Sequence, residues 1–361
     1  MVIGFLMLIG GAIMFCFRIT RIASAFAVLA CLAVPLAANA AESATHLLPD
    51  MPLHDPFIVA HAPSKTYYLY TSNIPQMTGV SRAGTMAYKS KDLRNWSGPT
   101  VVFQVPDGTW ADANEAAWAP EVHEYKGRYY LFTTLHNAKK LLSNQVNSGY
   151  AEHARGVVAA MSDTPDGPFK LLDPDKPVPP SQFMTLDGTL YVDPTGAPWM
   201  VYAHEWVQKG DGTFEAMPLK SDLSAAAGTP SHLFKASDAP WLDTTITPDG
   251  ERLNYVTDGC ELFRTKTGDL LMLWSSYKNG QYVETVARSE SGSLLGPWHQ
   301  QQPLLTNDSG HGMLFRNFAG ELMMVVHRPF KSAHGKLYEM SDDGDHLTIV
   351  RERTDLDGDT Q

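Results

Sequence analysis

The chain repeats one sequence pattern five times, and this repeat constrains the fold more than any other feature. Each copy begins with a polar opening, continues into a short apolar strand, turns at Gly or Pro, and returns as a second, strongly apolar strand. Two strands around such a turn are typical of a β-hairpin. The copies are HDPFIVAHAPSKTYYLYTS from His54, APEVHEYKGRYYLFTTLH from Ala119, DGTLYVDPTGAPWMVYAHE from Asp187, DGCELFRTKTGDLLMLWSSY from Asp258 and HGMLFRNFAGELMMVVHRP from His311.

A second phrase follows the hairpin in most copies and adds two strands to each unit. It consists of a strand, a polar turn and a Gly-Pro or Gly-Thr-Pro step, as in AYKSKDLRNWSGP from Ala87 and ARSESGSLLGPW from Ala287. Four strands per unit predict an all-β fold, a five-bladed β-propeller with four antiparallel strands per blade. The alternative is two β-domains joined at the Pro-rich residues 171–180. It is disfavoured because the repeat continues unchanged across that segment.

The first forty residues differ from the repeat region, and we expect residues 1–40 to be a signal peptide. Arg18 and Arg21 precede an apolar run, and a small-x-small pattern ends at Ala40. An uncleaved membrane anchor is the alternative, because another apolar stretch precedes the arginines. The expectation is a propeller domain over residues 41–361, secreted or periplasmic, that meets a membrane only if the leader stays attached.

Composition narrows the classes of partner. Without the leader the chain carries 26 basic against 39 acidic side chains, and such a surface repels nucleic acid and anionic lipid. The leader also contains two of the three cysteines, so Cys260 has no partner for an internal disulfide. We expect a monomer, stabilised by packing, that binds a neutral oligosaccharide or polysaccharide.

The repeat also predicts where a functional site lies. In a propeller every innermost strand runs along the central channel in the same sense and the second strand returns, so strand openings and strand ends converge on one face. Carboxylates gathered there repel one another and lose hydration, a cost that is common at functional sites. The openers are His54 with Asp55, Glu121, Asp187, Asp258 and His311, and the closers include His136, His204 with Glu205, and His327 with Arg328.

The openers HDPF, WAPEV, LDGT, TDG and GHGM, one per blade and in this order, resemble those of glycoside hydrolase family 43. These are the arabinofuranosidases, xylosidases and arabinanases of the five-bladed propeller fold, and the resemblance covers nearly all of residues 50 to 330. It implies an inverting glycosidase in which Asp55 is the general base. It also implies that the charge of Asp187 raises the pKa of the general acid. Inversion needs acid and base roughly 6.5 to 9.5 Å apart, to admit a water molecule.

The general acid is the point where this chain departs from the family pattern. The family commonly opens blade four with a glutamate in an EGP-like step, whereas this chain has DGC, with Asp258 at that position. Glu205 is the favoured donor, because its neighbour Trp206 can exclude water and raise its pKa. Asp258 is the second candidate and is otherwise an acceptor for a sugar hydroxyl. Glu261 is the third, but it lies on the order of 10 Å deeper.

Other candidates carry less specific signals. By the same resemblance, His311 faces a central calcium or water site, and Arg328 corresponds to an arginine that contacts the sugar. The alternative for His311 is a histidine whose hydrogen bonds are satisfied inside the channel. The alternative for Arg328 is a salt bridge to a carboxylate at the mouth. Trp118 and Trp206 stand next to mouth residues as stacking platforms, although aromatic residues in strands often belong to the core. The expected substrate-binding residues are His54, Trp118, Glu121, Trp206 and Arg328.

The expected function is that of an exported, exo-acting α-L-arabinofuranosidase or β-xylosidase that acts on polysaccharide fragments. It requires no cofactor, although the resemblance allows a structural calcium ion in the channel. The rival interpretation is a carbohydrate-binding propeller that has lost turnover. The missing EGP glutamate supports this rival, since propellers host many functions.

Overall fold

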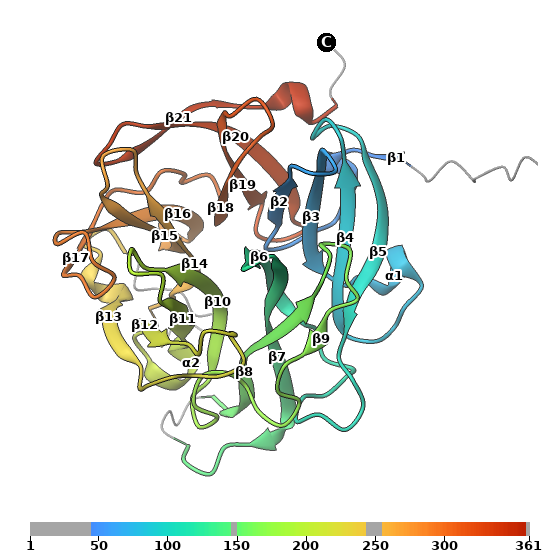
Figure 1. Cartoon of the computed structure of the whole chain (residues 1–361). Coiled ribbons are helices and arrows are strands. Elements are labelled where there is room, and N and C mark those ends of the chain that lie inside the picture. The colour runs from blue at the N-terminus through green and yellow to red at the C-terminus, as the bar shows by residue number, and fades with distance from the viewer. Residues whose placement is uncertain (1–44, 146–149, 243–254, 359–361) are drawn as a thin grey trace, which may run out of the picture. The chain divides into compact units, whose positions relative to one another are not determined.

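The structure, a computed structural model, describes residues 45–145, 150–242 and 255–358, which belong to one compact unit, Ser43–Gln361. Five antiparallel sheets of this unit stand around a common axis, along which Figure 1 looks. This arrangement is the five-bladed β-propeller that the repeat predicts. The expected signal peptide lies outside the described residues. No helix in the described ranges is long and apolar enough to cross a membrane.

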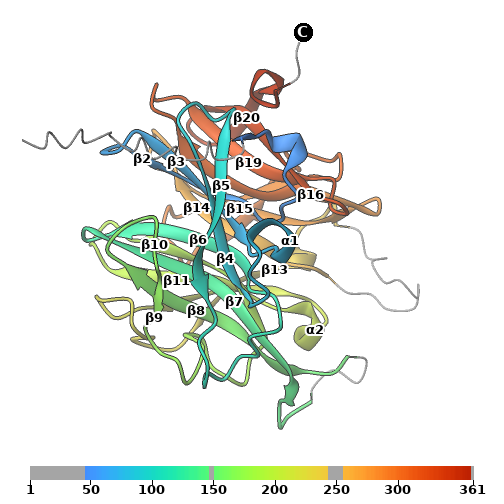
Figure 2. The same cartoon turned by 90° about the vertical axis from the view of Figure 1, so that its right-hand side faces the viewer.

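Each blade is an antiparallel meander in which consecutive strands pair in chain order, and Figure 2 shows the blades from the side. Blade 1 contains β2 (Phe57–His61), β3 (Thr66–Ser72), β4 (Gly84–Ser90) and β5 (Trp96–Gln104), and blade 2 contains β6 (Trp118–Tyr125), β7 (Arg128–Leu141), β8 (His153–Ser162) and β9 (Lys170–Leu171). Blade 3 contains β10 (Thr185–Val192), β11 (Pro198–His204), β12 (Thr213–Pro218) and β13 (Ser231–Lys235). Blade 4 contains β14 (Asp258–Arg264), β15 (Leu270–Lys278), β16 (Gln281–Ser289) and β17 (Trp298–Gln300), and blade 5 contains β18 (Gly310–Arg316), β19 (Leu322–Arg328), β20 (His334–Asp342) and β21 (Leu347–Glu352).

The segment before β2 joins the first blade to the last. A short strand that the repeat did not indicate, β1 (Thr45–His46), pairs with β5 at the outer edge of blade 1. Further along, the Leu53 N–H donates to the Ala333 carbonyl at 3.0 Å. The remaining elements are single turns: η1 (Leu48–Asp50), α1 (Pro75–Thr78), α2 (Trp206–Lys209), η2 (Ala236–Asp238) and η3 (Thr354–Leu356).

The second strand of each blade is buried because it is apolar on both faces, so that it packs against both neighbouring blades. In β11, Met200 and Tyr202 pack against blade 2, whereas Val201 and Ala203 face blade 4, and all four are fully buried. Cys260 is a free, buried cysteine within the interface of blades 3 and 4. Burial of this kind between blades stabilises the ring without a disulfide.

One residue at the start of every innermost strand has a left-handed backbone conformation. The φ angles are 49° at Asp55, 43° at Ala119, 52° at Asp187, 55° at Gly259 and 55° at His311. Gly adopts this region freely and Asp and His are enriched there, so the polar openers suit a backbone that kinks as it enters the channel. In blades 2 to 5 a β-bulge lies at the same place, and bulges commonly re-aim side chains at barrel rims and active sites.

Candidate active site

A pocket of about 660 Å³ opens at the mouth of the central channel, where the innermost strands begin, and is lined by residues from all five blades. Its walls are largely apolar, with Ile74, Tyr277 and Phe330 among them. No lysine or arginine is among the described residues that line it. The candidate residues that the structure brings together in its lining are His54, Asp55, Trp118, Asp187, Glu205, Trp206 and Asp258.

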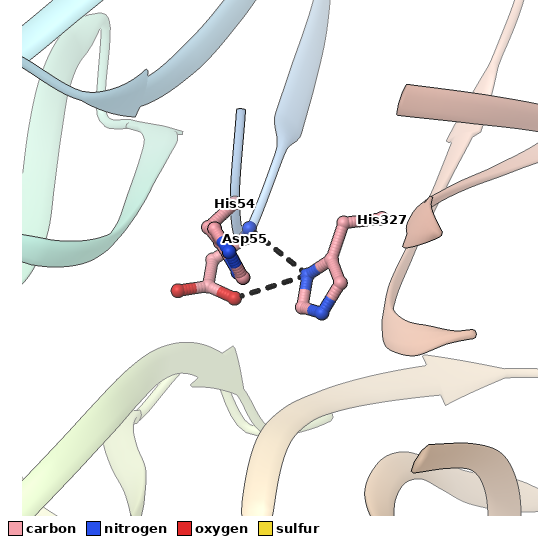
Figure 3. A group of neighbouring side chains, drawn as sticks. All are labelled: His54, Asp55 and His327. Atoms are coloured by element: carbon pink, nitrogen blue, oxygen red, sulfur yellow. Dashed lines mark hydrogen bonds and ion pairs between the residues drawn. The ribbon is translucent and has the colours of Figure 1, made fainter. Parts of the chain in front are cut away.

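The Asp55 carboxylate lies among three histidines. Its Oδ1 is 3.2 Å from Nδ1 of both His311 and His327, and the Asp55 backbone N–H also points to His327 Nδ1 at 3.2 Å (Figure 3). Burial raises the pKa of Asp55, but His311, His327 and the adjacent His54 outweigh burial and hold the pKa well below its usual value. Asp55 is therefore ionised throughout the neutral range, as a general base must be.

Asp187 and Asp258 form a carboxyl pair beside His311, which also contacts Asp55. Asp187 is almost fully buried, and its Oδ2 accepts a hydrogen bond from the Gly259 N–H at 2.9 Å. Burial, the charge of Asp258 and a hydrogen bond between the two carboxyl groups raise the pKa of Asp187 well above its usual value. Asp258 Oδ2 in turn accepts a hydrogen bond from the Tyr282 hydroxyl at 2.6 Å. Asp187 therefore favours its protonated form, and the two carboxyl groups share the hydrogen bond between them.

This pairing changes the role expected of Asp187. The family resemblance implies that the negative charge of Asp187 raises the pKa of the acid. In the structure the raised pKa of Asp187 favours its neutral form, so Asp187 carries that charge less readily than an isolated carboxyl group would. Asp258 contributes to raising the pKa of Glu205, although burial is the larger cause.

Glu205 follows β11 and precedes the single turn α2, so it stands at a strand end on the pocket side. Its side chain is only 6% exposed and both carboxylate oxygens accept hydrogen bonds from Nη1 of Arg155. Burial raises the pKa of Glu205, Arg155 opposes the rise, and the net pKa stays above its usual value. A buried carboxyl group of raised pKa beside Trp206 has the properties of a proton donor.

His311 lies behind the pocket and is almost fully buried. Its Nδ1 is 4.0 Å from Asp258 Oδ1, and His311, Asp187 and Asp258 offer possible metal ligands within 4.8 Å of one another. Calcium prefers six to eight oxygen ligands, whereas this group supplies two carboxylates and an imidazole, a combination that suits transition metals better. The group does not fit the calcium ion that the resemblance allows, and no catalytic step is assigned to a metal.

Glu121 and Arg328 were expected to bind substrate, but the structure does not bring them into the pocket. Ala119, not Glu121, has the left-handed opening position of blade 2, so Glu121 lies deeper, where its Oε2 is 2.8 Å from His123 Nε2. Arg328 turns to the outer strands of its own blade, where it binds both carboxylate oxygens of Glu352, at 2.8 and 2.6 Å.

Of the remaining candidates, Glu261 lies below the mouth, as expected, and its Oε2 accepts the Leu314 N–H at 2.6 Å. Trp118 is 38% exposed in the pocket wall, which leaves its ring accessible to a sugar.

Sequence reasoning missed Arg155 and Tyr282, which touch the carboxyl groups of Glu205 and Asp258. Both residues lie near the start of third strands, β8 and β16. A third strand begins at the face where the second one ends. The reasoning that places strand openings and strand ends at the mouth therefore also places the starts of third strands there. Tyr277, near the end of β15, and Phe330, just after β19, also line the pocket and had no comparable signal.

The mouth of this five-bladed propeller brings carboxyl groups of lowered and of raised pKa into one pocket with aromatic walls, an arrangement typical of glycoside hydrolases. The sequence profile described as "Glycosyl hydrolases family 43" matches residues 50–351, and the chain belongs to this family. The match confirms the family resemblance of the openers. The protein is thus a glycoside hydrolase, and inversion is characteristic of its family.

Several known proteins are similar to this chain. A solved structure of an endo-arabinase from Bacteroides thetaiotaomicron is 37% identical, with a TM-score of 0.74, and the match covers 84% of this chain and 100% of that one. The extracellular endo-alpha-(1->5)-L-arabinanase 1 of Bacillus subtilis (strain 168) is 23% identical over 164 residues. That match spans 43% of this chain and 44% of the relative, less than half of its length. An alpha-L-arabinofuranosidase from Lactobacillus brevis, 16% identical with a TM-score of 0.63 over 82% of this chain and 93% of that one, has the same fold.

Proposed function

We propose that the protein is an exported hydrolase of α-L-arabinofuranosyl bonds in arabinan-type polysaccharides and their fragments. The observation that carries the chemistry is the opposite protonation of carboxyl groups in one pocket, with Asp55 ionised and Glu205 of raised pKa. A pocket that only bound sugar would not need this separation. The rival interpretation, a binding propeller without turnover, is therefore disfavoured.

In the proposed reaction Asp55 accepts a proton from a water molecule whose oxygen attacks the anomeric carbon. The bond between that carbon and the glycosidic oxygen breaks, and Glu205 gives its proton to the departing oxygen. The aromatic rings of Trp118, Trp206 and Phe330 in the pocket walls supply surfaces on which the sugar packs. The reaction needs no metal, and unchanged activity after treatment with a chelator is the expected result.

Glu205 suits the role of donor better than Asp258 because of what each carboxyl group holds. Asp258 accepts hydrogen bonds from Tyr282 and Asp187, so its carboxylate oxygens are engaged as acceptors. Glu205 has a raised pKa, and within the described part of the chain Arg155 is the side chain that donates to it. Asp258 then acts through its charge and as an acceptor for a sugar hydroxyl.

The similarity to the Bacteroides endo-arabinase favours arabinan over xylan as the polymer. It also favours cleavage inside the chain, whereas the sequence-based expectation is cleavage at the end. Walls from all five blades make the site a pocket, which favours the end. Export is supported by the leader sequence and by the relative that is named extracellular.

The test is hydrolysis of linear arabinan, arabino-oligosaccharides and xylo-oligosaccharides by the purified protein, followed by chromatography of the products. We expect release of arabinose or arabino-oligosaccharides and little action on xylo-oligosaccharides. Arabinose as the sole early product indicates action at chain ends, and a ladder of oligosaccharides indicates internal cleavage. A protein that binds arabinan but releases nothing would contradict the proposal and support the binding propeller.

A further inference from the structure

Arg155 joins the proton donor to an aromatic wall of the pocket. Its Nη1 donates to both oxygens of Glu205, and its guanidinium carbon lies 4.9 Å from the centre of the Trp118 ring. A guanidinium group over an aromatic face is attracted to it, so the position of each group depends on the other. Glu205 comes from blade 3, whereas Trp118 and Arg155 come from blade 2.

Two histidines orient the guanidinium group from the other side. The Arg155 Nε–H points to His136 Nδ1 at 2.9 Å, and Nη2 is 3.2 Å from His153 Nε2. His136 is the cross-strand partner of Arg155 in blade 2, and its ring contacts Trp118, with 3.9 Å between the ring centres. Burial, together with the charge of Arg155, lowers the pKa of His136 well below its usual value, so His136 stays neutral and able to accept.

The burial of this cluster makes its geometry consequential. The side chains of Arg155 and Glu205 are 11% and 6% exposed, and a buried ion pair is strongly destabilised when one partner is removed. The planar guanidinium group also has a fixed geometry that a lysine does not reproduce. Arg155 therefore holds Glu205 in one orientation, while Trp118 remains partly open to a ligand.

We propose that Arg155 is the positioning residue of the reaction, which aligns the Glu205 carboxyl group with a sugar packed on Trp118. This inference rests on the proposed function and on Glu205 as the donor. Arg155 need not touch the sugar, because it acts through Glu205 and Trp118. Its cationic charge also opposes the effects of burial and of Asp258 on Glu205, so it sets the pH at which the donor loses its proton.

The test compares Arg155→Gln and Arg155→Lys with the wild type on two substrates, an arabino-oligosaccharide and dinitrophenyl α-L-arabinofuranoside. Only the oligosaccharide has a leaving group that needs its proton. For Arg155→Gln we expect kcat/KM to fall about 100-fold on the oligosaccharide and less than about tenfold on the dinitrophenyl substrate. We also expect the alkaline limb of its pH profile to move to higher pH, because Glu205 has lost the cation that favours its ionised form.

Arg155→Lys retains the positive charge but lacks the planar guanidinium group. We expect its alkaline limb to stay near that of the wild type while its rate on the oligosaccharide falls, which separates positioning from charge. A second pocket, of about 320 Å³, also lies against Arg155, so guanidinium ions added to Arg155→Ala have a route to the vacated position. Partial recovery of the oligosaccharide rate by guanidinium is expected.

Arg351→Gln is the matched control, since Arg351 pairs with Glu339 on the outer strands of blade 5 at 2.8 Å and is more than half exposed. Its two rates and pH profile should equal those of the wild type. Equal losses on both substrates in Arg155→Gln, with an unmoved alkaline limb, would overturn the inference while the proposed function stands. A wild type that cleaves no arabinoside would overturn both.

Discussion

Asp55 and Asp187 open the first and third blades with nearly the same backbone conformation, φ 49° and 52°, yet the pKa values of their carboxyl groups are shifted in opposite directions. Asp55 faces imidazoles, which favour its ionised form, whereas Asp187 is buried beside a second carboxylate. The backbone repeat thus presents the same side chain twice, and residues from neighbouring blades decide its charge.

The base role predicts a severe loss when Asp55 can no longer accept a proton. In Asp55→Asn we expect kcat on arabino-oligosaccharides to fall by about 10² to 10⁴-fold, because the amide keeps the shape but not the basicity. Sugar binding, measured by calorimetry, should persist. Asp163→Asn, in an exposed turn of blade 2, is the control and should retain full activity. A tenfold loss or less in Asp55→Asn removes Asp55 from the base role.

The shared proton predicts that Asp187 and Asp258 act as a unit on Glu205. Either single substitution by Asn leaves one ionisable member to carry the negative charge, so the alkaline limb of the pH profile should stay in place. The double variant loses that charge, and its limb should move to lower pH by roughly one pH unit, because the pKa of Glu205 is no longer raised by it. The measurement is kcat/KM against pH for all three variants.

The sequence-based expectation for this pair differs in one respect. If the charge of Asp187 tuned the acid directly, Asp187→Asn alone would move the alkaline limb downward. A limb that shifts in that single variant would therefore restore the original role of Asp187 and contradict the shared proton.

The donor role predicts a dependence on the leaving group for Glu205. Glu205→Gln should lower kcat/KM on natural oligosaccharides about 100-fold or more, but far less on a dinitrophenyl glycoside that leaves unaided. Asp258→Asn should lower both rates alike, since it weakens binding of the sugar. The reversed pattern would assign the donor role to Asp258, and equal losses from both variants would leave neither assignment.

The buried Glu284, on the third strand of blade 4, predicts a pH dependence of stability. Burial raises the pKa of Glu284 well above its usual value, although Ser275 and the Gly312 N–H donate to its Oε2. A pKa raised by folding contributes stability that is complete below the unfolded pKa of about 4.3 and is lost as pH rises through the folded pKa. The wild type should therefore lose stability from about pH 5 upward.

Glu284→Gln should remove part of this dependence. The free energy of unfolding of Glu284→Gln minus that of the wild type should be about 1 to 3 kcal/mol larger at pH 8 than at pH 5. Urea unfolding followed by tryptophan fluorescence at the two pH values measures it. The exposed Glu290→Gln is the control. Parallel stability curves for Glu284→Gln and the wild type would show that Glu284 titrates normally.

The sequence predicts the propeller well because the information that specifies it is local. Each hairpin is encoded by a short apolar pattern and a turn, and five such units bury their faces only against one another. The same symmetry places Asp55 and Asp187 at one mouth, since strand openings must converge whatever the side chains. Family membership then follows from the order of the openers.

The structure differs from the sequence-based expectation where the register of a strand, or a neighbour that the motif does not include, decides the position of a side chain. In blade 2 the left-handed opening position falls on Ala119, so Glu121 lies further along the strand and deeper than the pattern indicates. Arg328 finds Glu352 within its own blade instead of a pocket carboxylate. Neither outcome is visible in a short motif, because a bulge shifts the facing of every later residue in the strand.

The protonation of the site was decided only by tertiary structure. Asp55 meets His327, 272 residues later in the chain, and Glu205 meets Arg155, 50 residues earlier and on another blade. A carboxyl group keeps or loses its proton according to its burial and the charges within a few ångströms. The sequence specifies which carboxyl groups reach the mouth, whereas the packing of the blades around them sets which of those groups is the base and which retains a proton.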